Sequence, residues 1–509
     1  MYFDINKSLY EFMRTYHKKG DTLAVAHSRR KMSFPRFFKE VDRVAAGLYA
    51  LGVRKGDIVM HTLPNIIQSV VVTYALSRIG AIASMIHPLL SVDEFDAAVK
   101  KQKPKVVFLS DINSRKFSQK CGGVKRIVCP YLVYGYIGLP HAKEFVPNES
   151  NGEEVAFYMH SGGTFGEPKT IKLSARTANA MAGNLLCYLD DKFNENNRML
   201  AALPMFHAFG LCVGVHAAIS SNMAAILVPR FKVKAVTKTI ARYKVTTVIA
   251  VPRMVSKLLA YPKFSGDNIK SLQDVYVGGD SVSDELVHSF DKRMKECGGD
   301  GKLSPGYGLT ETASVCVLTH RGDFVSGSVG NPINGVDARI VDENMRELPI
   351  GEIGELIISG DQVMNGYLGG DEEENDKVFV WLDGKRFVRT GDLCRKDSEG
   401  RLYFMGRRKR LIKISGMNVF PYEIERVARE LPFVSECVAI EYRVKGKPFI
   451  KLLIEGSVTG AQKKEVVAHI SRRMSHWNTP STVECVAEFP RTRISKIDVK
   501  KLEEQYGNR

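Results

Sequence analysis

Residues 158–174 read YMHSGGTFGEPKTIKLS, a glycine-rich stretch that begins inside an apolar run. Three glycines, two small hydroxyl residues and one lysine supply many backbone N–H donors and one cation. Glycine lets the backbone approach a ligand closely, and hydroxyls donate to phosphate oxygens, so the stretch predicts a polyphosphate-binding loop after a buried strand. It is not a Walker loop, because Glu167 and Pro168 separate Gly166 from Lys169. A surface glycine turn without a ligand is the alternative that this stretch alone leaves open.

The composition is that of a globular protein with two or more domains. Its 509 residues exceed one ordinary core, and 44% hydrophobic and 25% charged residues are usual proportions. We expect no secretory signal and no membrane-spanning segment, because no basic-then-apolar start and no apolar run near about 18 residues is present. Nine scattered cysteines without CxxC pairs predict a reduced, cytoplasmic protein without a zinc site.

The formal net charge of +17 suits nucleic acid, an anionic membrane or anionic small molecules. The basic residues are dispersed, with the densest run at residues 407–410, and no aromatic-interleaved basic tract is present. We therefore expect anionic small molecules and no nucleic acid as ligands.

The first part of the chain alternates strands and helices. Helical periodicity predicts helices at residues 33–51 and 66–79, and a capping box at 91–94 opens a third. Buried strands are expected at 57–63, 81–86 and 105–110, and this alternation favours a parallel, doubly wound α/β sheet. No GxGxxG follows the first strand, so a dinucleotide site is not indicated.

The same pattern continues after the glycine-rich loop. We expect a helix at 175–189 and strands near 199–203, 246–251 and 275–277, several of which end in polar residues. In an open α/β sheet, residues just beyond the strand ends line the ligand crevice, so these loops are expected to converge on one site.

The sequence pattern changes twice in the last third of the chain. Short alternating strands with glycine turns from about residue 327 predict a small β-barrel, and the segment after Gly406 reads as a separate α+β domain. We expect a large N-terminal domain at residues 1–408 and a small C-terminal domain at 409–509.

Five motifs occur in the order seen in adenylate-forming enzymes, which comprise acyl- and aryl-CoA ligases, carrier-protein adenylation domains and firefly-type luciferases. The chain resembles this superfamily through SGGTFGEPK (161–169), GYGLTET (306–312), RTGDL (389–393), GRRKRLIKISGMNVFPYEIE (406–425) and PRTRISKI (490–497). GVRKGDIVMHTLPN (52–65) extends the likeness to nearly the whole chain. The resemblance implies two half-reactions: a carboxylate attacks ATP to give acyl-AMP and pyrophosphate, and a thiol then expels AMP.

The resemblance assigns roles to individual residues. Thr310 is expected to contact the α-phosphate and Glu311 to bind Mg²⁺, although a solvated loop glutamate is the plain alternative. Tyr307 is expected to stack on adenine unless it is a core tyrosine, and Asp392 to accept both ribose hydroxyls with Arg407 nearby. The residues expected to clasp the outer phosphates are Ser161, Gly162, Gly163, Thr164, Gly166 and Lys169. Those expected elsewhere around the nucleotide and CoA are Gly279, Asp280, Ser281, Gly308, Lys413, Ser415 and Gly416.

The last motif supplies the mobile cation. Lys496 matches the lysine that bridges the attacking carboxylate and the α-phosphate, where a point charge on a long stem is apt. A surface lysine is the plain alternative. The resemblance also implies a mobile C-terminal domain that swings about a hinge near Lys409 and Arg410, which brings the loop at Ser415 and Gly416 to the pantetheine tunnel.

Four positions depart from the pattern. Phe165 and Thr170 replace a usual threonine and glycine, and Ala175 replaces a common histidine. Phe165 removes a hydroxyl donor, so a weaker or different grip on phosphate is expected. Arg410 stands where aspartate or lysine is common, and is expected to be a charged, solvated pivot.

The sequence says less about which thiol accepts the acyl group and which carboxylic acid is activated. Asn418 and Pro421 favour CoA over a carrier protein, and the segment 208–211 lacks the aspartate of amino-acid-specific members. We therefore expect an apolar, fatty or aryl acid, with His207 as a gate at its pocket or merely a packed polar residue. Loading of an acyl or peptidyl carrier protein, a non-catalytic nucleotide-binding homologue and luciferase chemistry remain alternatives.

Overall fold

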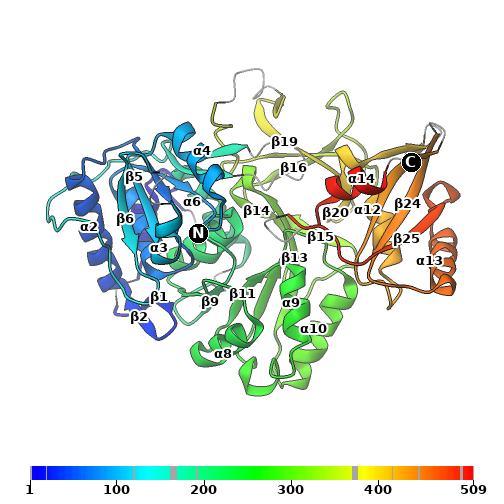
Figure 1. Ribbon diagram of the computed structural model, residues 1–509, viewed down its shortest axis with the longest axis horizontal. Coiled ribbons are helices and arrows are strands. Elements are labelled where there is room, and N and C mark those ends of the chain that lie inside the picture. Colours follow the sequence, from blue (N-terminus) through cyan, green and yellow to red (C-terminus); the bar gives the residue numbers. More distant parts are fainter. Residues whose placement is uncertain are drawn as a thin grey trace. The chain divides into compact units, whose positions relative to one another are not determined.

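The computed structural model describes residues 3–18, 20–117, 121–160, 169–190, 193–369, 377–414, 417–444, 447–492 and 497–507 (Figure 1). These form two compact units. The first unit contains the described parts of Met1–Ser161, Lys169–Asp337 and Ile358–Val388, and the second those of Ala338–Ile357 and Arg389–Arg509. The predicted division into domains at 1–408 and 409–509 stays a prediction. No helix in the described ranges is long and apolar enough to cross a membrane.

One sheet of the first unit has six strands in the order β6-β5-β3-β4-β7-β8. Its strands are parallel except β8, which runs antiparallel to β7. The strands are β3 (Ile58–His61), β4 (Ile82–Met85), β5 (Val106–Ser110), β6 (Lys125–Cys129), β7 (Val155–His160) and β8 (Thr170–Ser174). The helices along this part of the chain are α2 (Phe34–Ala50), α3 (Ile67–Arg78), α4 (Val92–Gln102), α5 (Asp111–Phe117) and α6 (Ala175–Tyr188). The predicted α/β alternation is therefore confirmed.

The predicted loop at residues 158–174 is wrong at both ends, because β7 extends to His160 and the chain is a strand again from Thr170. The pairing of β8 with β7 provides the backbone partners that the local sequence does not reveal. Residues 161–169 lie between the two strands, and all of them except Lys169 are outside the described residues.

The second sheet of the first unit contains the consecutive strands β2-β1-β10-β9-β11-β12-β13-β14-β15. From β1 to β13 the pairs are parallel, whereas β2 pairs antiparallel to β1 and β14 antiparallel to its neighbours β13 and β15. The strands are β1 (Leu23–His27), β2 (Arg30–Ser33), β9 (Arg198–Ala201), β10 (Ala224–Leu227), β11 (Thr247–Ala250), β12 (Asp274–Val277), β13 (Lys302–Leu309), β14 (Ser314–Leu318) and β15 (Ser328–Pro332). Helices α8 (Val233–Tyr243), α9 (Pro252–Leu259) and α10 (Asp284–Glu296) accompany this sheet (Figure 1).

Helix starts follow the capping chemistry that the sequence indicates. The capping box of α4 is present, with Ser91 accepting from the backbone N–H of Glu94 and the Glu94 carboxylate accepting in return. Helix α2 has Pro35 in its first turn, and the Ser33 side chain before it makes no capping hydrogen bond.

The apolar stretch after residue 205 forms a π-helix, η2 (Phe209–Ala217), which continues into α7 (Ala218–Ser220). Its His216 lies in a buried polar network. Nδ1 of His216 is 2.9 Å from the Tyr74 hydroxyl, and Nε2 is 3.0 Å from Oδ1 of Asn179. Asn179 also donates to the backbone carbonyls of Ile5 and Lys7, which fixes the segment before α1 (Leu9–Tyr16). Complete pairing is what makes such a buried network stable.

The second unit begins with strands in the order β16-β17-β19-β20 and ends in an α+β region. These strands are β16 (Asp337–Val341), β17 (Gly354–Ser359), β19 (Lys385–Lys396) and β20 (Leu402–Arg407); β18 (Phe379–Leu382) pairs with β19. The terminal region contains β21 (Ile412–Ile414), β22 (Met417–Val419), α12 (Pro421–Ala428), β23 (Cys437–Val444), β24 (Lys447–Glu455), α13 (Gly460–Arg473), β25 (Thr482–Val486) and α14 (Val499–Tyr506). Closure of the earlier strands into a β-barrel stays a prediction.

The core of the terminal region packs α12 and α13 against the sheet β23-β24-β25 (Figure 1). Trp477 packs at its edge, with its indole ring 4.2 Å from the His476 ring. The chain's other tryptophan, Trp381 on β18, is 69% exposed and belongs to the first unit.

Arg410 is not the solvated pivot that we expected. Its side chain is only 16% exposed, and it donates to the buried Glu425 carboxylate at 2.6 Å and to the carbonyl of Ala439. Arg429 lies 3.6 Å from the other oxygen of Glu425. Burial of a carboxylate is tolerated here because two guanidinium groups surround it.

Candidate active site

The GYGLTET motif lies partly within a strand. Strand β13 continues through Tyr307 and Gly308 and ends at Leu309. The earlier half of β13 pairs with β12, and its later half pairs with β14, with Tyr307 opposite Val317. Position 308 must be glycine, because a Cβ atom there would lie 1.9 Å from the carbonyl oxygen of Ser314.

Thr310 and Glu311 occupy a single turn, η4 (Thr310–Thr312), that joins β13 to β14. The buried Thr312 hydroxyl lies 3.1 Å from the carbonyl oxygen of Leu309 and 3.0 Å from that of Ser314. Ala313 and Ser314 have φ angles of 53° and 122°, which non-glycine residues rarely adopt. The structure therefore holds the Glu311 carboxylate on a tight, strained turn with fixed geometry.

The segment 362–368 supports this turn from the side. The Gln362 amide donates to the carbonyl oxygens of Thr312 and Val315, and the backbone N–H of Met364 donates to the carbonyl of Glu311 at 2.8 Å. The hydroxyl of Tyr367 donates to Oε1 of Glu311 at 3.2 Å. The glutamate is thus positioned through both its backbone and its side chain.

The same segment holds the described end of the glycine-rich loop. Its backbone pairs with β8, since the N–H of Leu368 donates to the carbonyl of Thr170 and Lys172 exchanges hydrogen bonds with residues 365 and 366. Nζ of Lys169 lies 4.5 Å from the centre of the Tyr367 ring. Tyr367 therefore contacts two predicted site residues, Lys169 with its ring and Glu311 with its hydroxyl.

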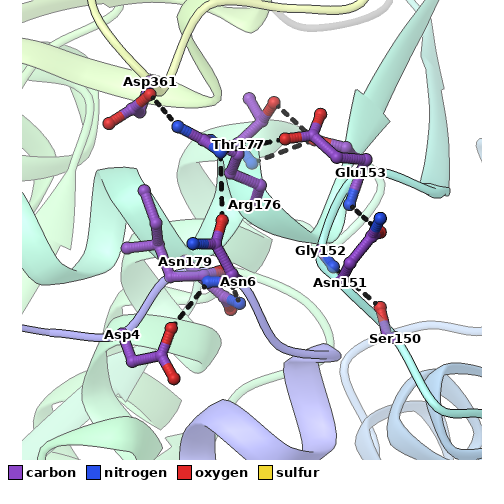
Figure 2. Close-up of polar contacts among 12 residues, drawn as sticks. Asp4, Asn6, Ser150, Asn151, Gly152, Glu153, Arg176, Thr177, Asn179 and Asp361 are labelled. Carbon is purple, nitrogen blue, oxygen red and sulfur yellow. Dashed lines mark hydrogen bonds and ion pairs between the residues drawn. The ribbon is translucent and has the colours of Figure 1, made fainter.

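Arg176 fixes the start of this segment, as Figure 2 shows. Its guanidinium donates to Asp361 at 2.7 Å, to Glu153 at 2.9 Å and to the Asn6 side chain at 3.0 Å. Three parts of the chain that are distant in sequence thus meet at the first turn of α6.

The predicted purine-edge residues follow β12. Gly279 has a φ of 81°, and a Cβ atom on Gly278 would lie 2.9 Å from the carbonyl oxygen of Gly306. The turn therefore packs directly against β13, which places Asp280 and Ser281, both with surface-accessible side chains, beside the GYGLTET motif. The Oδ1 atom of Asp280 accepts from the N–H of Ser281 at 2.9 Å.

His207 lies after β9 and just before η2. Its backbone N–H donates to the carbonyl of Pro204 at 3.1 Å, and its ring is 4.6 Å from that of Phe206. The ring is half-buried, which fits both a gate and a packed polar residue.

His160 ends β7, next to the loop. Burial, aided by the charge of Lys101, lowers the pKa of His160 to about 4, and the Thr170 hydroxyl lies 3.3 Å from Nδ1. The imidazole is therefore neutral at neutral pH.

In the second unit, Asp392 and Arg407 are opposite each other on β19 and β20. The Asp392 side chain is fully buried, and its Oδ1 lies 2.9 Å from Nε of Arg407, whose side chain is 46% exposed. The backbone N–H of Asp392 donates to the Thr390 hydroxyl, and Arg407 also donates to the Thr390 carbonyl. The accessible Arg407 guanidinium can bind a ligand that carries negative charge, whereas the Asp392 carboxylate has no exposed surface in this structure. Lys413 is exposed on β21.

Eight of the predicted site residues lie outside the described residues, as does Phe165, one of the positions that depart from the family pattern. The eight are Ser161, Gly162, Gly163, Thr164, Gly166, Ser415, Gly416 and Lys496.

Comparison with known families decides the class of protein. Residues 12–368 match the family described as AMP-binding enzyme, and residues 423–496 match the AMP-binding enzyme C-terminal domain. The chain belongs to the AMP-binding enzyme family. The predicted superfamily and the prediction of an enzyme are thereby confirmed.

Relatives of this AMP-binding enzyme are named as CoA ligases. A long-chain-fatty-acid–CoA ligase of Escherichia coli is 28% identical, over 99% of this chain and 96% of that protein. A 4-coumarate–CoA ligase-like protein of Arabidopsis thaliana is 26% identical, over 96% of this chain and 91% of that protein.

Solved structures have the same fold. ATP-bound MatB from Rhodopseudomonas palustris superposes with a TM-score of 0.89 at 23% identity, and the match covers 99% of each chain. The anthranilate CoA ligase AuaEII in complex with anthranoyl-AMP gives 0.86 at 22% identity, over 98% of this chain and 97% of that one. The predicted fold class, with a large N-terminal and a small C-terminal part, is confirmed.

Sequence reasoning did not identify Gln362 or Tyr367 as part of the site in this AMP-binding enzyme. Each contacts residues about fifty positions away in the sequence, and no local sequence pattern predicts such contacts. The local signal that could have suggested Tyr367 is an aromatic residue after a glycine in MNGYL, residues 364–368.

Proposed function

We propose that this enzyme is an ATP-dependent acyl-CoA ligase. It activates an apolar carboxylic acid as acyl-AMP, with release of pyrophosphate, and transfers the acyl group to the CoA thiol with release of AMP. The observation that carries this proposal is the arrangement of Lys169, Tyr367 and Glu311 within the family-matched region. The names of the relatives support the CoA thiol as acceptor.

The site groups suit the charge of ATP. Lys169 supplies a cation for the outer phosphates, and the Thr310 hydroxyl can donate to the α-phosphate. Glu311 fits Mg²⁺, because a single positioned carboxylate together with phosphate oxygens is a usual magnesium site. Bound there, Mg²⁺ would neutralise charge on the phosphates.

The remaining roles follow the resemblance. We propose that Tyr307, Gly308 and residues 279–281 bind the adenine, and that Asp392 and Arg407 bind the ribose. Lys413, Ser415 and Gly416 are proposed to contact the nucleotide and CoA. Lys496 bridges the acid and the α-phosphate and belongs to a mobile C-terminal domain. Because Arg410 is paired with Glu425 and Arg408 with Glu355, we place the pivot between them, at Lys409.

An apolar acid fits the segment 208–211, AFGL, which carries no charge to meet an ammonium group. The fatty-acid and coumarate names among the relatives support the same class, with His207 at the entrance to its pocket. We propose the cytoplasm as the location, since nine scattered cysteines suit a reducing compartment.

The test is mass spectrometry of the products formed from Mg-ATP, CoA and a pooled library of fatty, aryl and amino acids. We expect an acyl-CoA, AMP and pyrophosphate, and an apolar acid as the one consumed. A Glu311→Gln control should bind ATP yet need more Mg²⁺. Acyl-AMP without a thioester would move the acceptor to a carrier protein, and no turnover of any acid would overturn the proposal.

Lys496→Ala separates the two half-reactions. We expect it to slow adenylation by roughly a thousandfold while thioester formation from supplied acyl-AMP is largely retained. Equal loss of both half-reactions would contradict the role of Lys496.

A further inference from the structure

The segment after β6 exposes apolar side chains to water. Leu132 is 83% exposed, Val133 64% and Ile137 63%. A soluble domain normally leaves such side chains exposed singly rather than three within six residues. The close spacing of these exposed apolar side chains therefore indicates a function at the protein surface.

The backbone of this segment is held in place. The N–H of Tyr131 donates to the Asp111 carboxylate, the Gln68 amide donates to the carbonyl of Val133, and the Tyr134 hydroxyl donates to Glu40. Ile137 and Val128 exchange two backbone hydrogen bonds of 2.8 and 2.9 Å. The anchored backbone thus keeps the three side chains projecting outward.

Two further exposed side chains border the segment. Ile112 is 67% exposed and follows Asp111, the residue that binds the backbone of Tyr131. Leu89 is 75% exposed and follows Pro88, whose carbonyl accepts from Asn113 of the same helix α5. We call the five side chains the apolar ridge: Leu89, Ile112, Leu132, Val133 and Ile137.

The surroundings of the apolar ridge are basic. The segments 27–31, 87–91, 111–117 and 131–139 contain five cationic residues and one acidic residue, Asp111, and the neighbouring Glu40 is paired with Arg43. They meet around the ridge, since the His27 ring is 5.6 Å from that of Tyr131 and the Arg30 guanidinium lies 5.5 Å from the Tyr134 ring. The Asp111 carboxylate accepts from the N–H groups of Ile112 and Tyr131. The five cations are Arg29, Arg30, Lys31, Arg115 and Lys116.

We propose that the apolar ridge docks on an anionic lipid membrane. Apolar side chains that project together from an anchored loop can enter the boundary between headgroups and acyl chains, where their burial is favourable. Lysine and arginine around them meet lipid phosphates, and the net charge of +17 favours approach to such a surface. The proposal does not depend on the catalytic function, because membrane attachment can be measured without turnover.

The experiment is co-sedimentation of the full-length protein with vesicles of an equal phosphatidylcholine and phosphatidylglycerol mixture, and with phosphatidylcholine alone. We expect binding to the mixed vesicles, weakening as salt rises, and little binding to neutral ones. The triple variant Leu132→Ser, Val133→Ser and Ile137→Ser should lower the partition coefficient about tenfold or more. Ile350→Ser, which removes a side chain of similar 66% exposure elsewhere, should leave it unchanged.

A charge pair tests the basic surroundings. Arg29→Glu with Arg115→Glu should reduce binding about tenfold at low salt, whereas Lys257→Glu with Lys464→Glu, exposed lysines of other helices, should not. Equal thermal midpoints for all variants would show that the fold is kept. Absence of wild-type binding, or equal binding of the triple variant, would overturn the proposal. A dimer in solution that the triple variant abolishes would replace the lipid with a second copy of the chain.

Discussion

Tyr367 contacts two charged residues of the candidate site, although it carries no charge itself. Its ring faces the ammonium group of Lys169 while its hydroxyl donates to Glu311. A phenol hydrogen bond to a carboxylate fixes the direction of the remaining lone pairs, and a cation held over a ring has fewer orientations available. We therefore regard Tyr367 as a positioning residue for both charges.

Tyr367→Phe keeps the ring and removes the hydrogen bond to Glu311. We expect about a tenfold rise in the Mg²⁺ concentration needed for half-maximal pyrophosphate release, because a hydrogen bond to a charged group contributes about 1.5–3 kcal/mol. The measurement is a magnesium titration of adenylation at saturating ATP.

The matched control is Tyr403→Phe, since the Tyr403 hydroxyl also donates to a carboxylate, Asp397, at 3.1 Å. It should leave the magnesium requirement unchanged. The positioning role is ruled out if both variants behave alike.

At this scale the sequence predicts roles only where a motif is local. Glycine, hydroxyl and acidic residues in fixed motifs nominate Thr310, Glu311 and Tyr307, and these roles stay predictions. Arg410 was placed wrongly in solvent, since its partner Glu425 lies on a different element and is found only after folding.

At the scale of elements, the turn between β13 and β14 combines tight pairing with unfavourable backbone angles. Such angles cost about 1–3 kcal/mol each and persist where surrounding contacts determine them, here through Thr312 and Gln362. The strain lies directly beside Glu311.

Ser314→Gly relieves part of this strain, because glycine adopts a φ of 122° without a steric penalty. We expect the free energy of unfolding to rise by up to about 1 kcal/mol and adenylation to slow, as the turn gains alternative conformers. Urea denaturation and the rate of pyrophosphate release measure the two effects.

Ser28→Gly serves as the comparison, since Ser28 also has a positive φ, 59°, in an exposed turn. It should stabilise the protein without changing the rate. Equal rates of pyrophosphate release for both variants would mean that the backbone strain at Ser314 does not contribute to catalysis.

Glu425 joins three elements of the second unit. Its carboxylate accepts from Arg410 and from the backbone N–H of Ala439, with Arg429 nearby. Glu425→Gln leaves two partly buried guanidinium groups without their counter-charge, and we expect a loss of about 3 kcal/mol or more in unfolding free energy by circular dichroism.

Glu504→Gln removes an exposed pair with Lys500 instead, and should change stability by less than about 0.5 kcal/mol. Similar effects of the two substitutions would contradict the importance of burial at Glu425.

At the scale of the whole molecule, buried histidines make stability depend on pH. Burial lowers the pKa of His61 and of His160 to about 4 and that of His216 to about 3, from 6.5. The unfolded chain therefore binds more protons below pH 6.5, so stability is complete above that pH and falls as the pH drops toward 4 and 3.

Between pH 7 and pH 5 most carboxylates stay ionised, so the histidines should dominate the change. We expect the unfolding free energy to fall by up to about 1.4 kcal/mol per pH unit for each buried histidine once the pH is below 6.5. Urea denaturation across this range, with His216→Gln as the variant, should show a smaller slope for the variant. A stability that rises on acidification would refute the assignment.

The overall fold was largely predictable because its α/β pattern repeats locally, from the capping box of α4 to the buried strands β3 to β5. Pairings between distant segments were not, such as β1 with β10. Nor was the π-helix η2 predicted, since its apolar sequence carries no period that separates it from a strand or an α-helix.

The two tryptophans give each compact unit its own optical reporter. Trp381 is exposed and should emit at long wavelength, whereas Trp477 packs against the terminal core beside His476 and should emit at shorter wavelength. With Trp381→Phe or Trp477→Phe, fluorescence of the intact chain follows one unit at a time. Coincident unfolding curves would mean that the two units melt as a single cooperative body, and separated curves would give each its own free energy.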